Sequence, residues 1–192
     1  AGTYTIASTV YIPSNVTLQG AGQQATILLA VGAGFSMLEN RDGTSGNQGI
    51  VIRDLQVDGA GQSGNGIVLV KPLECHLQNL KVNNTYDGVE LNDPTNSGYY
   101  SYSTLSNVLV IDVRQKGFKI RMLRHVTLTD CIALRAAIEG FWGSDSDYVT
   151  LANCHAINSG QSGFKPSYDS QYWTFSSCIA RGNKWSGFDL TH

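Results

Sequence analysis

The sequence predicts an all-β fold: a right-handed, single-stranded parallel β-helix of about seven coils, with about three short strands in each. Three observations predict it: two sequence elements that recur in step, apolar residues that alternate at period two, and a composition rich in glycine and poor in charge. Charged residues are 15% of the chain and glycines number 21, which favours many turns over solvated helices. We interpret residues 1–192 as one domain and as a piece of a longer chain.

The first recurring element is Gly-apolar-x-apolar, as in Gly66-Ile67-Val68-Leu69. Its successive glycines are 32, 22, 29, 23, 23 and 24 residues apart. Alternation broken by Gly, Asn, Asp and Ser gives about three short strands in a repeat of this size. A leucine-rich repeat has a similar period, but its run of leucines and its return segment are not visible. The glycines are Gly34, Gly66, Gly88, Gly117, Gly140, Gly163 and Gly187.

The second element, apolar-x-polar-apolar-x-apolar, keeps step with the first, because its polar positions are 25, 28, 23, 23 and 24 residues apart. Coils that stack at strand spacing, roughly 4.8 Å, place equivalent residues in ladders along the axis. We expect a polar ladder at the turn between the second and third strands, where short polar side chains accept the bend. Its members are Asp54, Asn79, Asn107, Asp130, Asn153 and Ser177.

Two interior ladders follow from the same alignment. One is aromatic, and the other contains three of the four cysteines, which replace Leu and Val and are therefore expected to be buried thiols rather than disulfides. No Cys or His pair has the spacing of a zinc site, so no transition metal is expected. The ladders are Phe118, Phe141, Phe164 and Phe188, and Leu55, Leu80, Val108, Cys131, Cys154 and Cys178.

The charge pattern gives no support for nucleic acid or a membrane as partner. The formal net charge is -2, and the basic residues are scattered rather than clustered. No stretch approaches the roughly 18 apolar residues of a membrane span.

One outward strand face gathers most of the chemistry. Residues that alternate with the interior positions of the Gly-apolar strand form an outward row, and a neighbouring row contains Asn92 and Arg121. Acids, bases and an aromatic ring thus lie in adjacent coils of a chain that is otherwise poor in charge. The alternative is that these residues are solvated and pair across coils. The first row is Val68, Glu90, Lys119, Trp142, Lys165 and Asp189.

The two oversized repeats place their extra residues just after this strand, at 39–48 and 93–103. We expect two long loops that wall a groove. The second contains Tyr99 and Tyr100, whose rings could stack on sugars.

The opening phrase from Gly2-Thr3-Tyr4 through Ile12-Pro13-Ser14-Asn15-Val16 to Gly20-Ala21-Gly22 resembles the first coil of the pectate-lyase-like superfamily. The later coils resemble its mannuronan epimerase, polysaccharide lyase and phage depolymerase branches. The segment 86–92 is similar to the epimerase motif Tyr-Gly-Phe-Asp-Pro-His, with Glu90 in place of Asp and Asn92 in place of His. The resemblance implies a β-helix, a polysaccharide as partner, and an extracellular, cell-surface or virion-surface location.

The resemblance implies lyase or epimerase chemistry on an acidic polysaccharide. Such enzymes remove a proton α to a carboxylate, which requires a base and a cationic or metal clamp. Lys119 or Lys165 is the candidate base and Arg121 the clamp or acid, and Glu90 is a further candidate catalytic residue. Calcium is the candidate cofactor. Further expected sugar contacts are Trp142, Asn92, Tyr99, Tyr100 and Asp189, and the expected calcium ligands are Glu90, Asn92 and Asp93.

A non-catalytic role remains open beside this one. The chain could be a β-helical fibre, a glycan-binding module or a spacer of a surface or phage tail protein, and it could form oligomers. Ice binding is disfavoured, because the two outward rows of the Gly-apolar strand are mixed and charged rather than a regular array of threonine.

Overall fold

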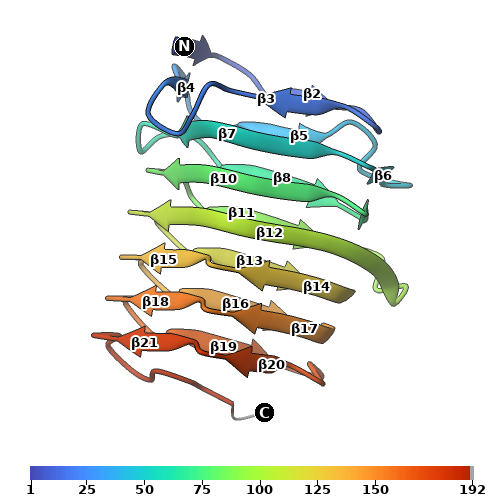
Figure 1. Ribbon diagram of the computed structural model, residues 1–192, viewed down its shortest axis with the longest axis vertical. Helices are drawn as coiled ribbons and strands as arrows, with labels where there is room; N and C mark the ends of the chain where they lie inside the picture. Colours follow the sequence, from blue (N-terminus) through green and yellow to red (C-terminus); the bar gives the residue numbers. More distant parts are fainter. Residues whose placement is uncertain (191–192) are drawn as a thin grey trace.

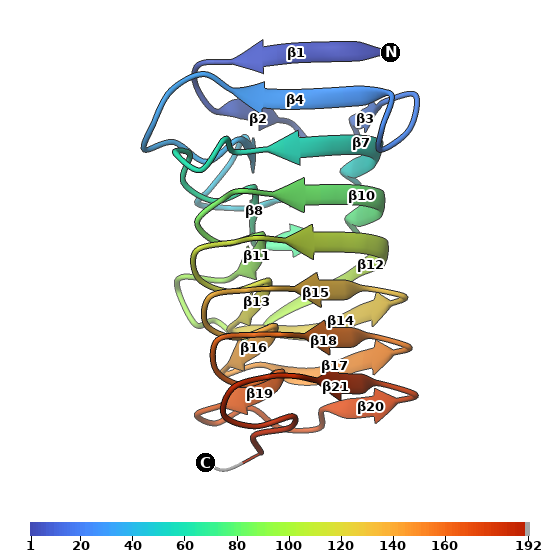
Figure 2. The ribbon, with the colours of Figure 1, turned by 90° about the vertical axis from the view of Figure 1, so that its left-hand side faces the viewer.

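The computed structural model describes residues 1–190, and all its regular elements are strands in parallel pairs (Figures 1 and 2). Within these residues no helix is long and apolar enough to cross a membrane. Both views show the chain winding through stacked coils from one end to the other, as predicted.

The strands form two long sheets and one short one. The 12-stranded sheet comprises β1 (Gly2–Ile6), β3 (Thr17–Gln19), β4 (Thr26–Ala30), β7 (Val51–Asp58), β10 (His76–Asn83), β12 (Tyr99–Ile111), β14 (Leu123–Thr129), β15 (Ile132–Leu134), β17 (Asp147–Ala152), β18 (His155–Ile157), β20 (Thr174–Ser176) and β21 (Ile179–Arg181). The 7-stranded sheet comprises β2 (Val10–Ile12), β5 (Leu38–Asn40), β8 (Ile67–Val70), β11 (Val89–Asn92), β13 (Phe118–Arg121), β16 (Phe141–Ser144) and β19 (Phe164–Ser167). The short sheet pairs β6 (Asn47–Gln48) with β9 (Pro72–Leu73).

The 7-stranded sheet has one more level than the glycine count predicted. Its seven strands are followed by a bridge between Phe164 and Phe188, which gives about eight coils. The additional level is β2, whose sequence lacks the Gly-apolar element. The first predicted repeat is also out of register, because Leu38, and not Phe35, pairs with Ile67.

The polar ladder lies at a bend of the backbone, as predicted. All six residues have φ between 50° and 59°, the left-handed region that Asn and Asp adopt more readily than most residues. The side chains also bond along the stack: the Asn79 amide donates to Asp54 at 2.7 Å, and the Asn107 amide donates to Asn79 at 3.1 Å. Each coil therefore turns at a residue that tolerates the turn, and hydrogen bonds link neighbouring turns.

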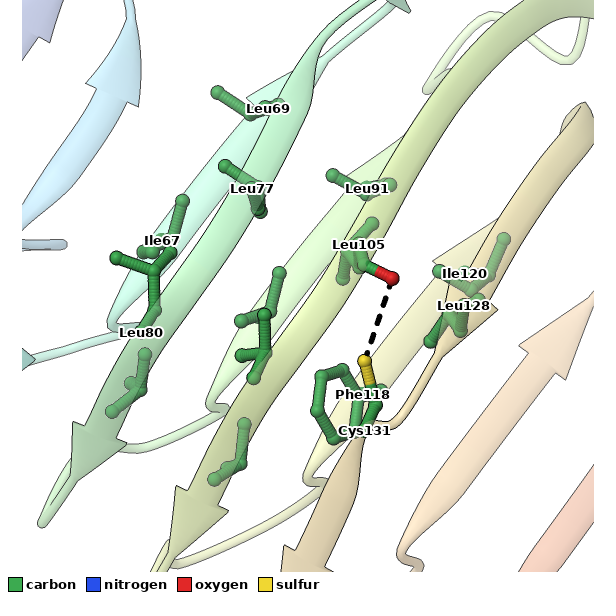
Figure 3. Packing of buried hydrophobic residues seen from close by; sticks show 14 of the residues in the cluster. Ile67, Leu69, Leu77, Leu80, Leu91, Leu105, Phe118, Ile120, Leu128 and Cys131 are labelled. Atoms are coloured by element: carbon green, nitrogen blue, oxygen red, sulfur yellow. Dashed lines mark hydrogen bonds between the residues drawn. The ribbon is translucent and has the colours of Figure 1, made fainter. Parts of the chain in front are cut away.

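Both predicted interior ladders form, but their last members are not fully interior, because Phe188 is 41% exposed and Cys178 is only partly buried. Figure 3 shows Phe118 of the first ladder and Leu80 and Cys131 of the second among the buried residues. The rings of Phe118, Phe141, Phe164 and Phe188 stack with successive centroids 4.6, 4.8 and 4.7 Å apart. The four cysteines are free thiols, and the Cys131 Sγ lies 3.6 Å from the Leu105 carbonyl oxygen. Each aromatic contact contributes about 0.5–1.5 kcal/mol beyond burial.

The two predicted long loops are shorter than expected. In the first, strand β5 extends to Asn40 and β6 begins at Asn47, which leaves residues 41–46 as the connection. In the second, Tyr99 already belongs to β12, so the loop covers 93–98. The tyrosines expected on this loop therefore lie on a strand.

Candidate functional site

The 7-stranded sheet brings the predicted outward row into register. Glu90 pairs with Lys119, Lys119 with Trp142, and Trp142 with Lys165. The second row is equally aligned, since Asn92 lies beside Arg121. The expected juxtaposition of acids, bases and an aromatic ring is therefore observed, but its charges are largely paired.

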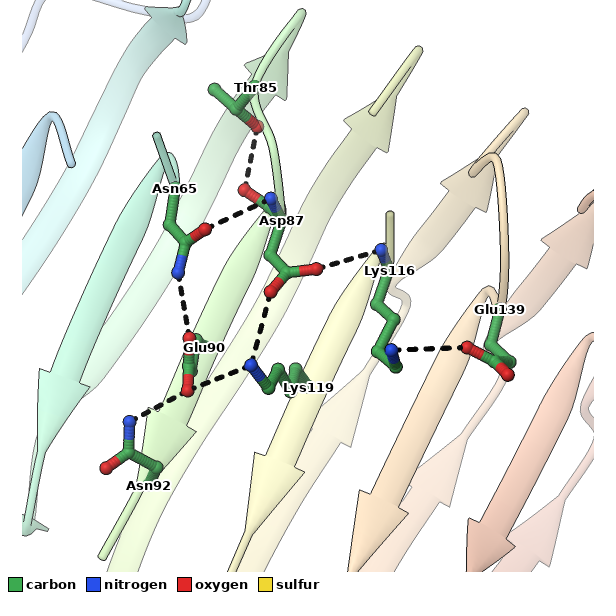
Figure 4. A network of polar contacts seen from close by, with 8 residues as sticks. All are labelled: Asn65, Thr85, Asp87, Glu90, Asn92, Lys116, Lys119 and Glu139. Atoms are coloured by element: carbon green, nitrogen blue, oxygen red, sulfur yellow. Dashed lines mark hydrogen bonds and ion pairs between the residues drawn. The ribbon is translucent and has the colours of Figure 1, made fainter. Parts of the chain in front are cut away.

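Lys119 is held between two buried carboxylates (Figure 4). Its Nζ lies 3.2 Å from Glu90 Oε1 and 3.3 Å from Asp87 Oδ2. Glu90 also accepts hydrogen bonds from the amides of Asn65 at 2.8 Å and Asn92 at 2.9 Å. This group is a closed network with little room for a ligand.

The electrostatics of Lys119 oppose its predicted role as a base. Burial alone would lower the pKa of Lys119, but the charges of Glu90 and Asp87, together with their hydrogen bonds, outweigh it and raise the pKa above 10.5. A general base near neutral pH needs the opposite shift. In this arrangement Lys119 is therefore a structural cation that neutralises buried acids.

A second charged group lies along the same face. Lys116 Nζ is 3.6 Å from Glu139 Oε2 and 5.0 Å from the centre of the Trp142 ring. Glu139 is buried, and its Oε2 has no hydrogen-bond partner. Burial raises the pKa of Glu139, although Lys116 and Lys165 act in the opposite direction. A carboxyl whose pKa is perturbed by burial and by a specific charge partner is a recognised property of catalytic acids and bases.

Arg121 and Trp142 line a shallow hollow of about 280 Å³ together with Ser144, Asp145 and Tyr168. Arg121 makes no ion pair with any residue in 1–190. The Asp145 carboxylate accepts a hydrogen bond from the Ser144 hydroxyl. The hollow therefore contains an aromatic ring and a guanidinium that has no ion-pair partner among residues 1–190. Both belong to the predicted outward rows.

The donor set does not fit the predicted calcium site. Both Asp93 oxygens already accept hydrogen bonds, from the backbone and hydroxyl groups of Thr95 and Ser97 at 2.6–3.0 Å. Burial alone would raise the pKa of Asp93, but these bonds lower it. Glu90 is occupied by Lys119, and no cluster of three or more His, Cys, Asp or Glu suited to a metal forms within 1–190. Asp93 instead organises the loop at 93–98.

The remaining predicted residues do not line this hollow, although Lys165 is the neighbour of Trp142 in the sheet. Lys165 Nζ forms an ion pair with Asp189 at 3.1 Å. Tyr99 is partly buried and packs against the hydrophobic core. Tyr100 is half-exposed on the other sheet, with Arg124 over its ring at 5.6 Å.

Asp87, Lys116 and Glu139 complete the charged face and were not predicted from the sequence. Each precedes the glycine of its repeat, and together with Asn65 they form another column in successive coils. Extending the alignment one residue toward the N-terminus of each element would have revealed this column.

Residues 42–192 match a family model described as the right handed beta helix region, which covers more than half of the chain. The chain belongs to the right-handed β-helix family. No curated protein sequence matches it.

Solved structures share this β-helix fold at low sequence identity. Pre-mature bacteriophage phi29 gene product 12 has a TM-score of 0.81 at 18% identity, over 94% of this chain and 28% of that one. Pectate lyase Pel9A has a TM-score of 0.65 at 18% identity, over 99% of this chain and 55% of that one. The A-module of Azotobacter vinelandii mannuronan C-5 epimerase AlgE6 has a TM-score of 0.57 at 15% identity, over 94% and 66%. This chain thus spans less than two thirds of the length of gene product 12 and of pectate lyase Pel9A.

Proposed function

We propose that this β-helix binds an acidic polysaccharide in the hollow of Arg121 and Trp142, at the surface of a cell or virion or outside a cell. The observation that carries the proposal is the guanidinium of Arg121. Among residues 1–190 it makes no ion pair, whereas most other cations of this face are neutralised. A guanidinium binds a carboxylate through two parallel hydrogen bonds. The adjacent Trp142 ring offers an apolar surface to a sugar. Two of the similar structures are named as enzymes of uronic-acid polymers, pectate and mannuronan.

Retardation in native gels that contain polygalacturonate or alginate tests this binding. Arg121→Gln should weaken it about tenfold or more, because a hydrogen bond to a charged group contributes about 1.5–3 kcal/mol. Arg181→Gln is the matched control, since Arg181 is exposed on β21, away from the hollow. Equal retardation of the two variants and the wild type would contradict the proposed site.

Lyase or epimerase chemistry is a second candidate, and Glu139 is the observation that favours it. The Glu139 carboxylate has a raised pKa, and its ion-pair partner Lys116 lies over the Trp142 ring. This carboxylate could remove the proton α to the sugar carboxylate, with Arg121 stabilising the charge that develops. Elimination would then break the bond to the leaving sugar and create an unsaturated product, whereas an epimerase would return a proton to the opposite face.

Two readouts separate catalysis from binding alone. A lyase produces ultraviolet absorbance from the unsaturated sugar, and an epimerase incorporates deuterium from heavy water into the polymer. Glu139→Gln should abolish either signal while retaining gel retardation. If wild-type protein binds the polymers but gives neither signal, the β-helix is a binding module.

A further inference from the structure

A column of exposed aromatic rings crosses four successive coils on the 12-stranded sheet, away from the charged face. Tyr102, His125, Tyr148 and Tyr172 stack with successive ring centres 5.0, 4.9 and 4.7 Å apart and planes within 15° of parallel. The three tyrosines are 45–64% exposed. The stack is therefore ordered and accessible along its outer edge.

The backbone at this column is unusual for aromatic residues. All four have φ between 49° and 57°, where side chains other than Gly, Asn and Asp are uncommon. The equivalent positions of the first three coils carry Asn15, Gly49 and Glu74, all in the same left-handed conformation, so the turn itself does not require an aromatic residue. From Tyr102 onward, every coil has an aromatic residue at this position, which points to a role for the rings beyond turning the chain.

A column of threonines runs beside the rings. Thr104 pairs with Thr127, Thr127 with Thr150, and Thr150 with Thr174, each two residues after a ring. Three of these threonines and all four rings line a hollow of about 470 Å³. Figure 1 shows the strands that carry the four threonines, β12, β14, β17 and β20, stacked one above another.

The hollow is polar and has no Asp, Glu, Lys or Arg in its lining. Its lining contains only Tyr, His and Thr, which supply hydroxyl and ring-nitrogen donors and acceptors. Arg124 and Asp147, which flank the column in sequence, pair with each other at 3.4 Å. An acidic or basic ligand would meet no Lys, Arg, Asp or Glu in this lining, so the lining favours a neutral partner that is rich in hydroxyl groups.

The spacing selects a periodic ligand. The ring faces inside the stack are covered by neighbouring rings, so a ligand meets ring edges, hydroxyls and threonine methyl groups that repeat once per coil. A linear polysaccharide presents a repeating set of hydroxyls and apolar ring edges. A second protein copy fits less well, because lasting interfaces between copies are more apolar than this lining.

We propose that this surface, which we call the tyrosine–threonine groove, binds a linear, uncharged polysaccharide that lies parallel to the helix axis. The groove consists of Tyr102, His125, Tyr148, Tyr172, Thr127, Thr150 and Thr174. It lies on a different sheet from Arg121 and Trp142, so it does not depend on the acidic site.

Affinity electrophoresis of the whole chain tests the groove, with xylan, mannan, dextran and mixed-linkage β-glucan as neutral probes and polygalacturonate as the acidic probe. At least one neutral polymer should retard the wild-type protein. The double variant Thr127→Val/Thr150→Val keeps the branched side chains but removes two hydroxyls, and should bind roughly 30-fold more weakly, because a neutral hydrogen bond is worth about 1 kcal/mol. Tyr148→Phe keeps the ring stack and should weaken binding several-fold.

Thr129→Val is the matched control, since Thr129 is on the same strand, β14, but does not line the groove. It should bind as wild type does, and circular dichroism checks that every variant folds. No retardation by any neutral polymer, retardation by polygalacturonate alone, or equal binding by the double variant would each overturn the proposal. So would sedimentation that shows an oligomer lost in the double variant, because a second copy would then cover the surface.

Discussion

Replacing Lys119 with methionine tests how the charged face is held together. Lys119→Met removes two ion pairs of 3.2 and 3.3 Å and leaves Glu90 and Asp87, only 7% and 3% exposed, without their cation. Removing one partner of a buried ion pair costs about 3–5 kcal/mol, because the remaining charge stays desolvated. We therefore expect the free energy of unfolding to fall by at least about 3 kcal/mol.

Urea unfolding followed by circular dichroism measures this loss. Lys184→Met is the control, since Lys184 is exposed, and should change stability by less than about 0.5 kcal/mol. Adding Glu90→Gln to Lys119→Met should restore part of the loss, because one of the two stranded carboxylates is then neutral. A Lys119→Met variant within about 1 kcal/mol of wild type would refute the view that Lys119 neutralises a buried acidic pair.

Three further predictions concern the core and the buried acid. Phe141→Ala should cost about 3–5 kcal/mol in urea unfolding, and Phe188→Ala less, because Phe188 is 41% exposed; equal losses would contradict the assigned burial. The pKa of Glu139 is raised above its ordinary value of 4.5, so above that pH the folded state keeps a proton that the unfolded state releases. The contribution of Glu139 to the free energy of unfolding therefore falls as the pH rises. The melting temperature of Glu139→Gln relative to that of the wild type should therefore rise between pH 4.5 and neutrality. A difference in melting temperature that stays constant with pH would refute this. Cys75, whose thiol pKa is raised by burial, should react with a thiol reagent only on unfolding, and rapid labelling of the native protein would contradict its burial.

Much of the fold was predictable because a β-helix repeats its constraints in every coil. The glycine spacing gave the register of β8, β11, β13, β16 and β19, and the polar spacing gave the bend. The prediction was wrong at Gly34. The Gly-apolar pattern is present there, but it is Leu38, and not Phe35, that pairs with Ile67 in the sheet.

The site was harder to predict, because its properties depend on contacts between columns. The outward row was aligned correctly, yet Lys119 also forms an ion pair with Asp87, which lies outside the aligned strand. The tyrosine–threonine groove did have a signal, since its rings are 23, 23 and 24 residues apart. The groove was not predicted because Tyr102 falls in the segment 93–103 that was expected to be a loop. Alternation at period two also does not reveal positions where the backbone adopts the left-handed conformation.

The most direct test of the proposed function is a crystal structure of this β-helix soaked with a short galacturonate or mannuronate oligomer. The proposal predicts a sugar carboxylate bonded to the Arg121 guanidinium, with the adjacent ring against Trp142. An oligomer that binds elsewhere on the β-helix, or a ligand-free hollow at saturating concentration, would contradict it.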